Sequence, residues 1–117
     1  MVLAEAVHHA RAMEWRIRCE PQRAAACIKI DDAPVGIAEG REAGSWTAGV
    51  AASGNGVGLS YCDLRKRDAA KRDRLIAVSA DALRAAGADY VIDSVADLWP
   101  VVEAIAARIA AGECPAR

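Results

Sequence analysis

At 117 residues the sequence has the length of one domain with a modest core, and we treat residues 1–117 as a single domain. Its formal net charge of −1 argues against nucleic acid and acidic membrane surfaces as partners, and its four cysteines form no C-x-x-C pair that would favour a structural zinc site. No stretch has the apolar character of a membrane span or a signal peptide, which predicts a cytoplasmic protein.

The first part of the chain predicts a helix, a connection and a strand. Apolar residues recur at spacings of three and four over residues 2–15, which is typical of an amphipathic helix that packs on a sheet. Residues 16–26 contain Pro21 and predict a connection with room for a helical turn. The β-branched run over residues 27–30 predicts a strand, and two adjacent carboxylates follow it.

A second helix and a second strand come next. Pro34 suits the first turn of a helix over residues 34–43, and Gly44 suits its end. Residues 46–51 are nearly all apolar, as expected for a strand that is covered on both faces. Residues 52–60 are too rich in glycine for a helix or a central strand, and they predict a loop.

The last half of the chain completes an alternating pattern. Residues 62–86 predict one long helix or two short ones, ended by Gly87. One face of this helix is expected to be apolar, with Leu75, Val78, Ala82, Leu83 and Ala86. A strand over residues 88–94 and a helix over residues 95–111 follow, with Ser94 as a cap. The order α-β-α-β-α-β-α predicts an α/β fold in the form of a three-layer α/β/α sandwich with a parallel sheet.

Asp31 and Asp32 lie where such a fold binds its ligands. In open parallel sheets, ligands bind beyond the carboxyl ends of the strands, so this acidic corner could hold a cation or a phosphate-bearing substrate. The alternative is a solvated strand end, where the second acid caps the helix that begins near Pro34. The residues alone leave both interpretations open.

Several segments stand in a distinctive order along the chain. They are Ile28-Lys29-Ile30-Asp31-Asp32, Pro34, Gly36-Ile37-Ala38-Glu39-Gly40-Arg41, Ala43-Gly44, Trp46-Thr47, Gly49-Val50, Ser53-Gly54-Asn55, Gly58-Leu59 and Gly87-Ala88-Asp89-Tyr90-Val91-Ile92-Asp93-Ser94-Val95-Ala96-Asp97-Leu98. Together they resemble the carboxyl-terminal half of the phosphonoacetaldehyde hydrolase (phosphonatase) family, which belongs to the haloacid dehalogenase superfamily. The resemblance runs from about residue 12 to the end.

This resemblance implies a partial haloacid dehalogenase core with a Rossmann-like sheet. It also implies a Mg²⁺-dependent hydrolase that cleaves the C–P bond of phosphonoacetaldehyde to acetaldehyde and phosphate. In the family, a cap-domain lysine forms a Schiff base with the aldehyde, and an aspartate on the first core strand attacks phosphorus. By resemblance, Asp32 binds magnesium, and its neighbour Asp31 either binds the metal too or supports the site.

The sequence also departs from the family. The nucleophile, the cap and the Schiff-base lysine belong to a part of the family that this chain does not match, and Ala33 stands where the family usually has threonine. We therefore expect a fragment that is inactive alone and carries no catalytic residue. The alternative function is a non-catalytic α/β module that binds Mg²⁺ or a phosphate group at Asp31 and Asp32.

Other residues have ordinary structural explanations. Lys29 lies within the predicted strand, so we expect a surface or strand-end lysine. Cys27 is expected to be buried filler, and Ser53-Gly54-Asn55 a connecting loop. The charged run over residues 63–74 mixes both signs at helical spacing, which is typical of a solvated helix face.

One consequence of the resemblance concerns assembly. The family pairs its nucleophile-bearing strand with the strand that corresponds to residues 27–30. Without that partner, an apolar strand edge would be exposed, and a homodimer is a possible outcome.

Overall fold

The computed structural model describes residues 24–52 and 61–115. The helix expected over residues 2–15 and most of the glycine-rich loop lie outside these ranges. The described elements are η1 (Ala24–Ala26), β1 (Ile28–Asp31), α2 (Pro34–Glu42), β2 (Trp46–Val50), α3 (Tyr61–Lys66), α4 (Ala69–Ala85), β3 (Tyr90–Ile92), η2 (Val95–Asp97) and α5 (Leu98–Ala110).

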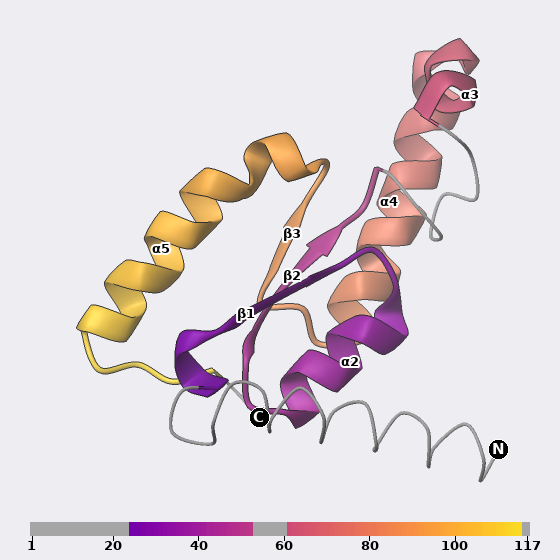
Figure 1. Cartoon of the computed structure of the whole chain (residues 1–117). Helices are drawn as coiled ribbons and strands as arrows, with labels where there is room; N and C mark the ends of the chain where they lie inside the picture. The colour runs from indigo at the N-terminus through magenta and orange to yellow at the C-terminus, as the bar shows by residue number, and fades with distance from the viewer. Residues whose placement is uncertain (1–23, 53–60, 116–117) are drawn as a thin grey trace, which may run out of the picture.

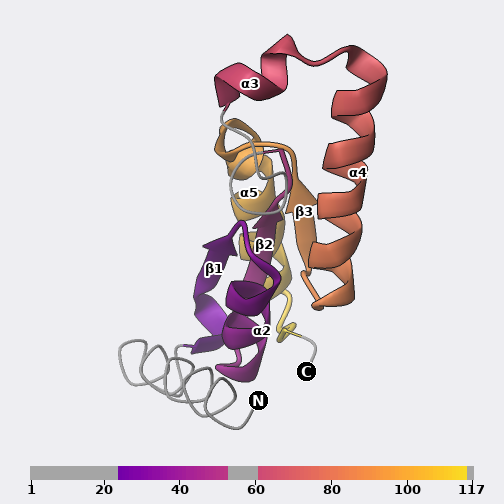
Figure 2. The same cartoon turned by 90° about the vertical axis from the view of Figure 1, so that its right-hand side faces the viewer.

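The described strands form one parallel sheet in the order β1-β2-β3. Helices α2 and α4 cover one face of this sheet, and α5 covers the other (Figures 1 and 2). The three-layer α/β/α arrangement predicted from the sequence is therefore confirmed. The strand bounds differ slightly from the predicted ones. β1 is shifted by one residue, and β2 and β3 are shorter than predicted.

Two glycines end helices where the sequence predicted. Gly44 has φ 85° and follows α2, and Gly87 has φ 95° and follows α4. Side chains other than glycine rarely adopt these angles. The charged stretch forms two helices rather than one, because Asp68 accepts a hydrogen bond from the Lys71 backbone N–H at 2.9 Å and so starts α4.

The core consists of one apolar cluster on each face of the sheet. On one face, Ile37 of α2 packs with Ala80 and Leu83 of α4. On the other face, Trp46 packs with Val101 and Ile105 of α5; Ala51 joins the first cluster and Ala48 the second. Trp46 and Ala48 of β2 belong to the second cluster, Gly49 lies close to Leu83 of the first, and all five residues of β2 are buried.

The apolar face predicted for α4 is wrong in part. Val78 is 68% exposed and Ala82 is exposed, whereas Ser79, Ala80 and Leu83 are buried. The first half of α4 extends beyond the sheet (Figure 1), so only its second half packs there. Contact with the sheet, rather than the spacing of apolar residues, decides which face of α4 is buried.

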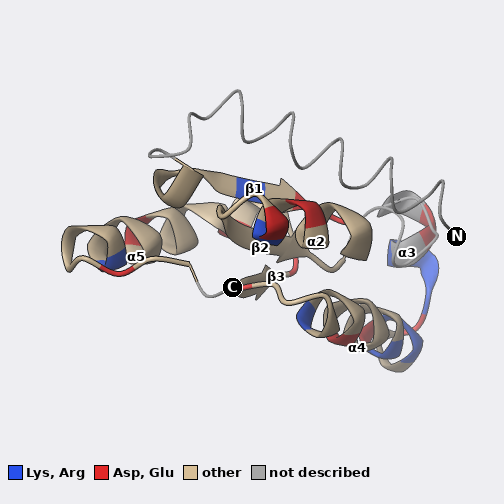
Figure 3. Cartoon of the chain, turned by 90° about the horizontal axis from the view of Figure 1, so that it is seen from below, with Lys and Arg blue, Asp and Glu red and all other residues tan. Residues whose placement is uncertain are grey.

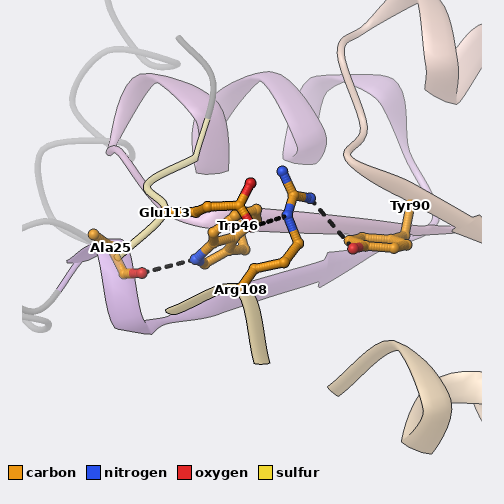
Figure 4. Close-up of polar contacts among 5 residues, drawn as sticks. All are labelled: Ala25, Trp46, Tyr90, Arg108 and Glu113. Atoms are coloured by element: carbon orange, nitrogen blue, oxygen red, sulfur yellow. Dashed lines mark hydrogen bonds and ion pairs between the residues drawn. The ribbon is translucent and has the colours of Figure 1, made fainter. Parts of the chain in front are cut away.

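Trp46 fixes the amino-terminal end of the sheet (Figure 4). Its indole Nε1–H donates a hydrogen bond to the Ala25 carbonyl at 2.8 Å, and the guanidinium carbon of Arg108 lies 4.4 Å from the ring centroid. Arg108 also donates to the Tyr90 hydroxyl at 3.2 Å and to Glu113 at 3.3 Å. The hydrogen bond to Tyr90 is the main cause that raises the pKa of Arg108 above its usual value. This contact network joins η1, β2, β3 and the end of α5.

Candidate functional site

The three strands end beside a cleft of about 340 Å³. Its walls are Ile30 and Asp31 at the end of β1, Asp32 directly after it, Val50 at the end of β2, and Val95 just beyond β3. The structure therefore brings both predicted site acids to the carboxyl edge of the sheet, where ligands bind in folds of this kind.

The carboxylate of Asp31 has two partners. Oδ1 accepts a hydrogen bond from the Ala33 backbone N–H at 3.0 Å, and Oδ2 lies 3.3 Å from Lys29 Nζ. The side chain packs against the first turn of α2, where a Cβ on Gly36 would collide with the carboxylate. A glycine at this position therefore gives the Asp31 side chain its room.

Lys29 lies within the strand, as predicted, but it is less exposed than a typical surface lysine. Its side chain is 21% exposed, and Nζ lies 3.8 Å from Glu39 Oε2 as well as near Asp31. Glu39 belongs to α2 and is 4% exposed. Strand residues two apart point to the same face, so Lys29 and Asp31 both face α2. The three side chains form an ionic cluster that ties β1 to α2.

Asp32 lines the cleft, and it is not the N-cap residue of α2. The N-cap residue is Ala33, and no side chain makes the capping hydrogen bond. The acid that bonds near the start of the helix is Asp31, through the Ala33 N–H. A turn between the strand and the helix places the two adjacent acids in different roles.

Sequence reasoning missed Glu39 as part of this region. The sequence gives Glu39 no role beyond membership of the predicted helix, because a charged residue inside a helix is most often solvent-exposed. One signal in the sequence could have indicated it. Side chains alternate along β1, so Lys29 faces the helix that follows the strand. A lysine covered by a helix needs an acidic partner, and Glu39 is an acid on that helix.

The described residues contain no group of three or more His, Cys, Asp and Glu side chains close enough together to hold a metal ion. Ser53-Gly54-Asn55, His8 and His9 lie outside the described ranges. Cys27 is half-buried, in partial agreement with the prediction of buried filler. Among the residues that line the cleft at the carboxyl edge, Asp31 and Asp32 carry the carboxylates.

A second cleft, of about 290 Å³, lies along α4 and is lined by Arg67, Lys71, Arg74, Leu75 and Val78. Basic residues gather where α3 joins α4, with acidic residues among them (Figure 3). Lys71 lies 3.8 Å from Asp68, and both side chains are more than half exposed. This is the solvated, mixed-charge helix face that the sequence predicted.

The described residues form no helix that is both long and apolar enough to cross a membrane. No protein-family model matches the chain. Its relatives among curated and solved proteins are more informative.

Phosphonoacetaldehyde hydrolase of Paraburkholderia phytofirmans strain PsJN is 48% identical to the chain over 93 residues, which are 80% of this chain and 35% of that protein. The protein of the same name from Paraburkholderia xenovorans strain LB400 is 50% identical over 97 residues, with the same coverage of 80% and 35%. The chain thus spans 35% of the length of these curated relatives.

The solved structures agree with the sequences. The crystal structure of a phosphonoacetaldehyde hydrolase-like protein from Oleispira antarctica matches with a TM-score of 0.75 and 44% identity, over 79% of this chain and 33% of that one. Over the part that matches, this chain therefore resembles the phosphonoacetaldehyde hydrolases in both sequence and fold.

Proposed function

We propose that this chain supplies the cation-binding corner of a phosphonoacetaldehyde hydrolase of the haloacid dehalogenase superfamily. The reaction would be Mg²⁺-dependent hydrolysis of the C–P bond of phosphonoacetaldehyde to acetaldehyde and phosphate, in the cytoplasm. The observation that carries the proposal is the pair Asp31 and Asp32 at the carboxyl edge of a parallel sheet, in a chain 48% identical to an enzyme of that name.

Magnesium fits the donors at this corner. Mg²⁺ prefers oxygen ligands and is commonly held by one or two carboxylates together with waters and substrate phosphate groups. Asp32 would hold the ion, and Asp31 lies beside it in the lining of the cleft. When bound, the metal would offset negative charge on the phosphoryl oxygens.

No residue of this chain is assigned as nucleophile or as Schiff-base lysine. Lys29 is unsuited to the second role, because it lies in β1 and pairs with Asp31 and Glu39. We propose that these catalytic groups come from the part of the relatives that this chain does not match.

The purified chain is therefore expected to show no measurable hydrolysis of phosphonoacetaldehyde. The measurement is release of acetaldehyde in the presence of Mg²⁺, with the full-length enzyme of P. phytofirmans assayed in parallel as the positive control. Turnover by this chain that survives Asp32→Ala would contradict both the role of Asp32 and the need for further segments.

A second candidate function is a non-catalytic module that binds Mg²⁺ or a phosphate group at Asp31 and Asp32. Two observations favour it. The chain matches 35% of the length of its relative, and the acidic corner lies within the matching part. The two candidates differ in one result. Only the enzyme proposal requires that turnover appear once the remaining segments are supplied.

We also propose that the chain forms a homodimer through β1. Among the described strands, β1 pairs only with β2, and Ile30 is 41% exposed. The Cys27 carbonyl accepts from the Trp46 N–H, so by alternation the backbone groups of Ile28 and Ile30 point to the other edge. Such an edge is a template for strand pairing.

Sedimentation velocity over a range of concentrations tests the dimer. We expect self-association that weakens in Ile30→Lys, because a lysine on an edge strand opposes pairing. The control is Val78→Lys, the same kind of substitution at a more exposed apolar residue on α4. A clean monomer at all concentrations would refute the proposal.

A further inference from the structure

The Asp31 carboxylate is held in place by two neighbouring groups of the protein. Both oxygens of Asp31 have protein partners, namely the Ala33 N–H at 3.0 Å and Lys29 Nζ at 3.3 Å. Its side chain is 24% exposed, and it lies against the first turn of α2 at Gly36. Asp32 lines the same cleft.

Lys29 is itself well anchored. Its second partner, Glu39, has a side chain 6% exposed, so the ion pair stands largely out of water. Removing one member of a buried ion pair leaves an uncompensated charge, which is strongly unfavourable. Glu39 therefore fixes the ammonium group beside Asp31, and the ammonium offsets the charge of that carboxylate.

We propose that Asp31 is a positioning residue that Lys29 holds against α2 and away from the bound cation. This inference rests on the proposed function. Asp31 shapes the turn that presents Asp32, while Lys29 limits the negative charge of the cleft. The chemical benefit is that an anionic phosphonate can approach the metal, since a second ligating carboxylate would bind Mg²⁺ more tightly but would repel the substrate.

The test is a Mg²⁺ titration of the whole chain, followed by the ¹H–¹⁵N resonances of residues 30–33. Lys29→Met should release Asp31 to join the cation, and because affinity rises with the number of charged ligands, binding should tighten about tenfold. Lys29→Arg keeps the charge and should match the wild type. Lys29→Met combined with Asp31→Asn should return to about the wild-type affinity.

A second measurement needs no metal. The Ala33 amide is hydrogen-bonded to Asp31, so its hydrogen-exchange rate reports whether the carboxylate stays in place. In Lys29→Met we expect this exchange rate to rise about fivefold, because losing one ordinary hydrogen bond changes the opening equilibrium by about that factor. Lys29→Gln is the alternative variant if Lys29→Met does not fold.

The outcomes separate the two proposals. Folded Lys29 variants with unchanged Ala33 exchange would overturn the positioning role, whether or not the chain binds metal. Mg²⁺ affinity that is unchanged or weaker in Lys29→Met would overturn the charge-limiting role. Absence of Mg²⁺ binding in every form, with faster Ala33 exchange in Lys29→Met, would support Lys29 as the residue that holds Asp31 and would count against the proposed metal function.

Discussion

Asp32→Asn is expected to weaken Mg²⁺ binding by the chain at least tenfold, because the substitution replaces a charged oxygen ligand with a neutral amide of nearly the same shape. The fold should be largely retained, since asparagine has nearly the same shape as aspartate and the N-cap residue of α2 is Ala33. Titration followed by the ¹H–¹⁵N resonances of residues 30–33 is the suitable measurement. Trp46 fluorescence would report poorly, because this side chain is buried at the opposite end of β2.

The matched control is Asp81→Asn, which changes the same kind of group on the exposed surface of α4. Asp81 lies 3.2 Å from Arg84 and its side chain is 80% exposed. Its substitution should leave Mg²⁺ affinity within experimental error of the wild type. If Asp32→Asn and Asp81→Asn gave equal affinities, Asp32 would not be a metal ligand.

Trp46→Ala is expected to destabilise the fold by about 3–5 kcal/mol, the usual cost of removing a large buried aromatic side chain. Trp46 is fully buried, it packs with Val101 and Ile105, and its indole N–H bonds to the Ala25 carbonyl. Domains of this kind have only about 5–15 kcal/mol of stability in total. The midpoint of urea unfolding, followed by circular dichroism, should therefore fall sharply.

Trp99→Ala provides the same substitution at an exposed site. Trp99 is 67% exposed and makes a hydrogen bond to Glu103 within α5. We expect a loss of about 0.5 kcal/mol or less, the usual range for surface substitutions. Similar unfolding midpoints for the two variants would show that Trp46 is not a central part of the core.

The sequence predicted the parts of the fold that local chemistry decides. Glycine marks the ends of α2 and α4 because Gly44 and Gly87 adopt positive φ angles. Ser94 caps the structure that follows it, as its hydroxyl accepts from the Ala96 N–H at 3.2 Å, although the first turn is the 3-10 helix η2 rather than an α-helix. The place of Asp31 and Asp32 at the carboxyl edge follows from strand polarity alone.

Features that depend on packing between distant segments could not be predicted in this way. The buried face of α4 was predicted only in part, because the length of α4 that overlies the sheet is a tertiary property (Figure 1). The same holds for Lys29, whose ion pair with Glu39 depends on how α2 packs on β1. The distinction between Asp31 and Asp32 required the turn between β1 and α2, which turns Asp31 toward Lys29 and Ala33.

The central claim is that this chain carries the metal-binding part of a phosphonoacetaldehyde hydrolase site. Its most direct test is phosphate release from phosphonoacetaldehyde by a hybrid in which this chain replaces the matching 35% of the P. phytofirmans enzyme. We predict Mg²⁺-dependent turnover by the hybrid, and about a hundredfold loss or more in its Asp32→Asn variant. A folded hybrid with no turnover, or one whose turnover survives Asp32→Asn, would contradict the claim.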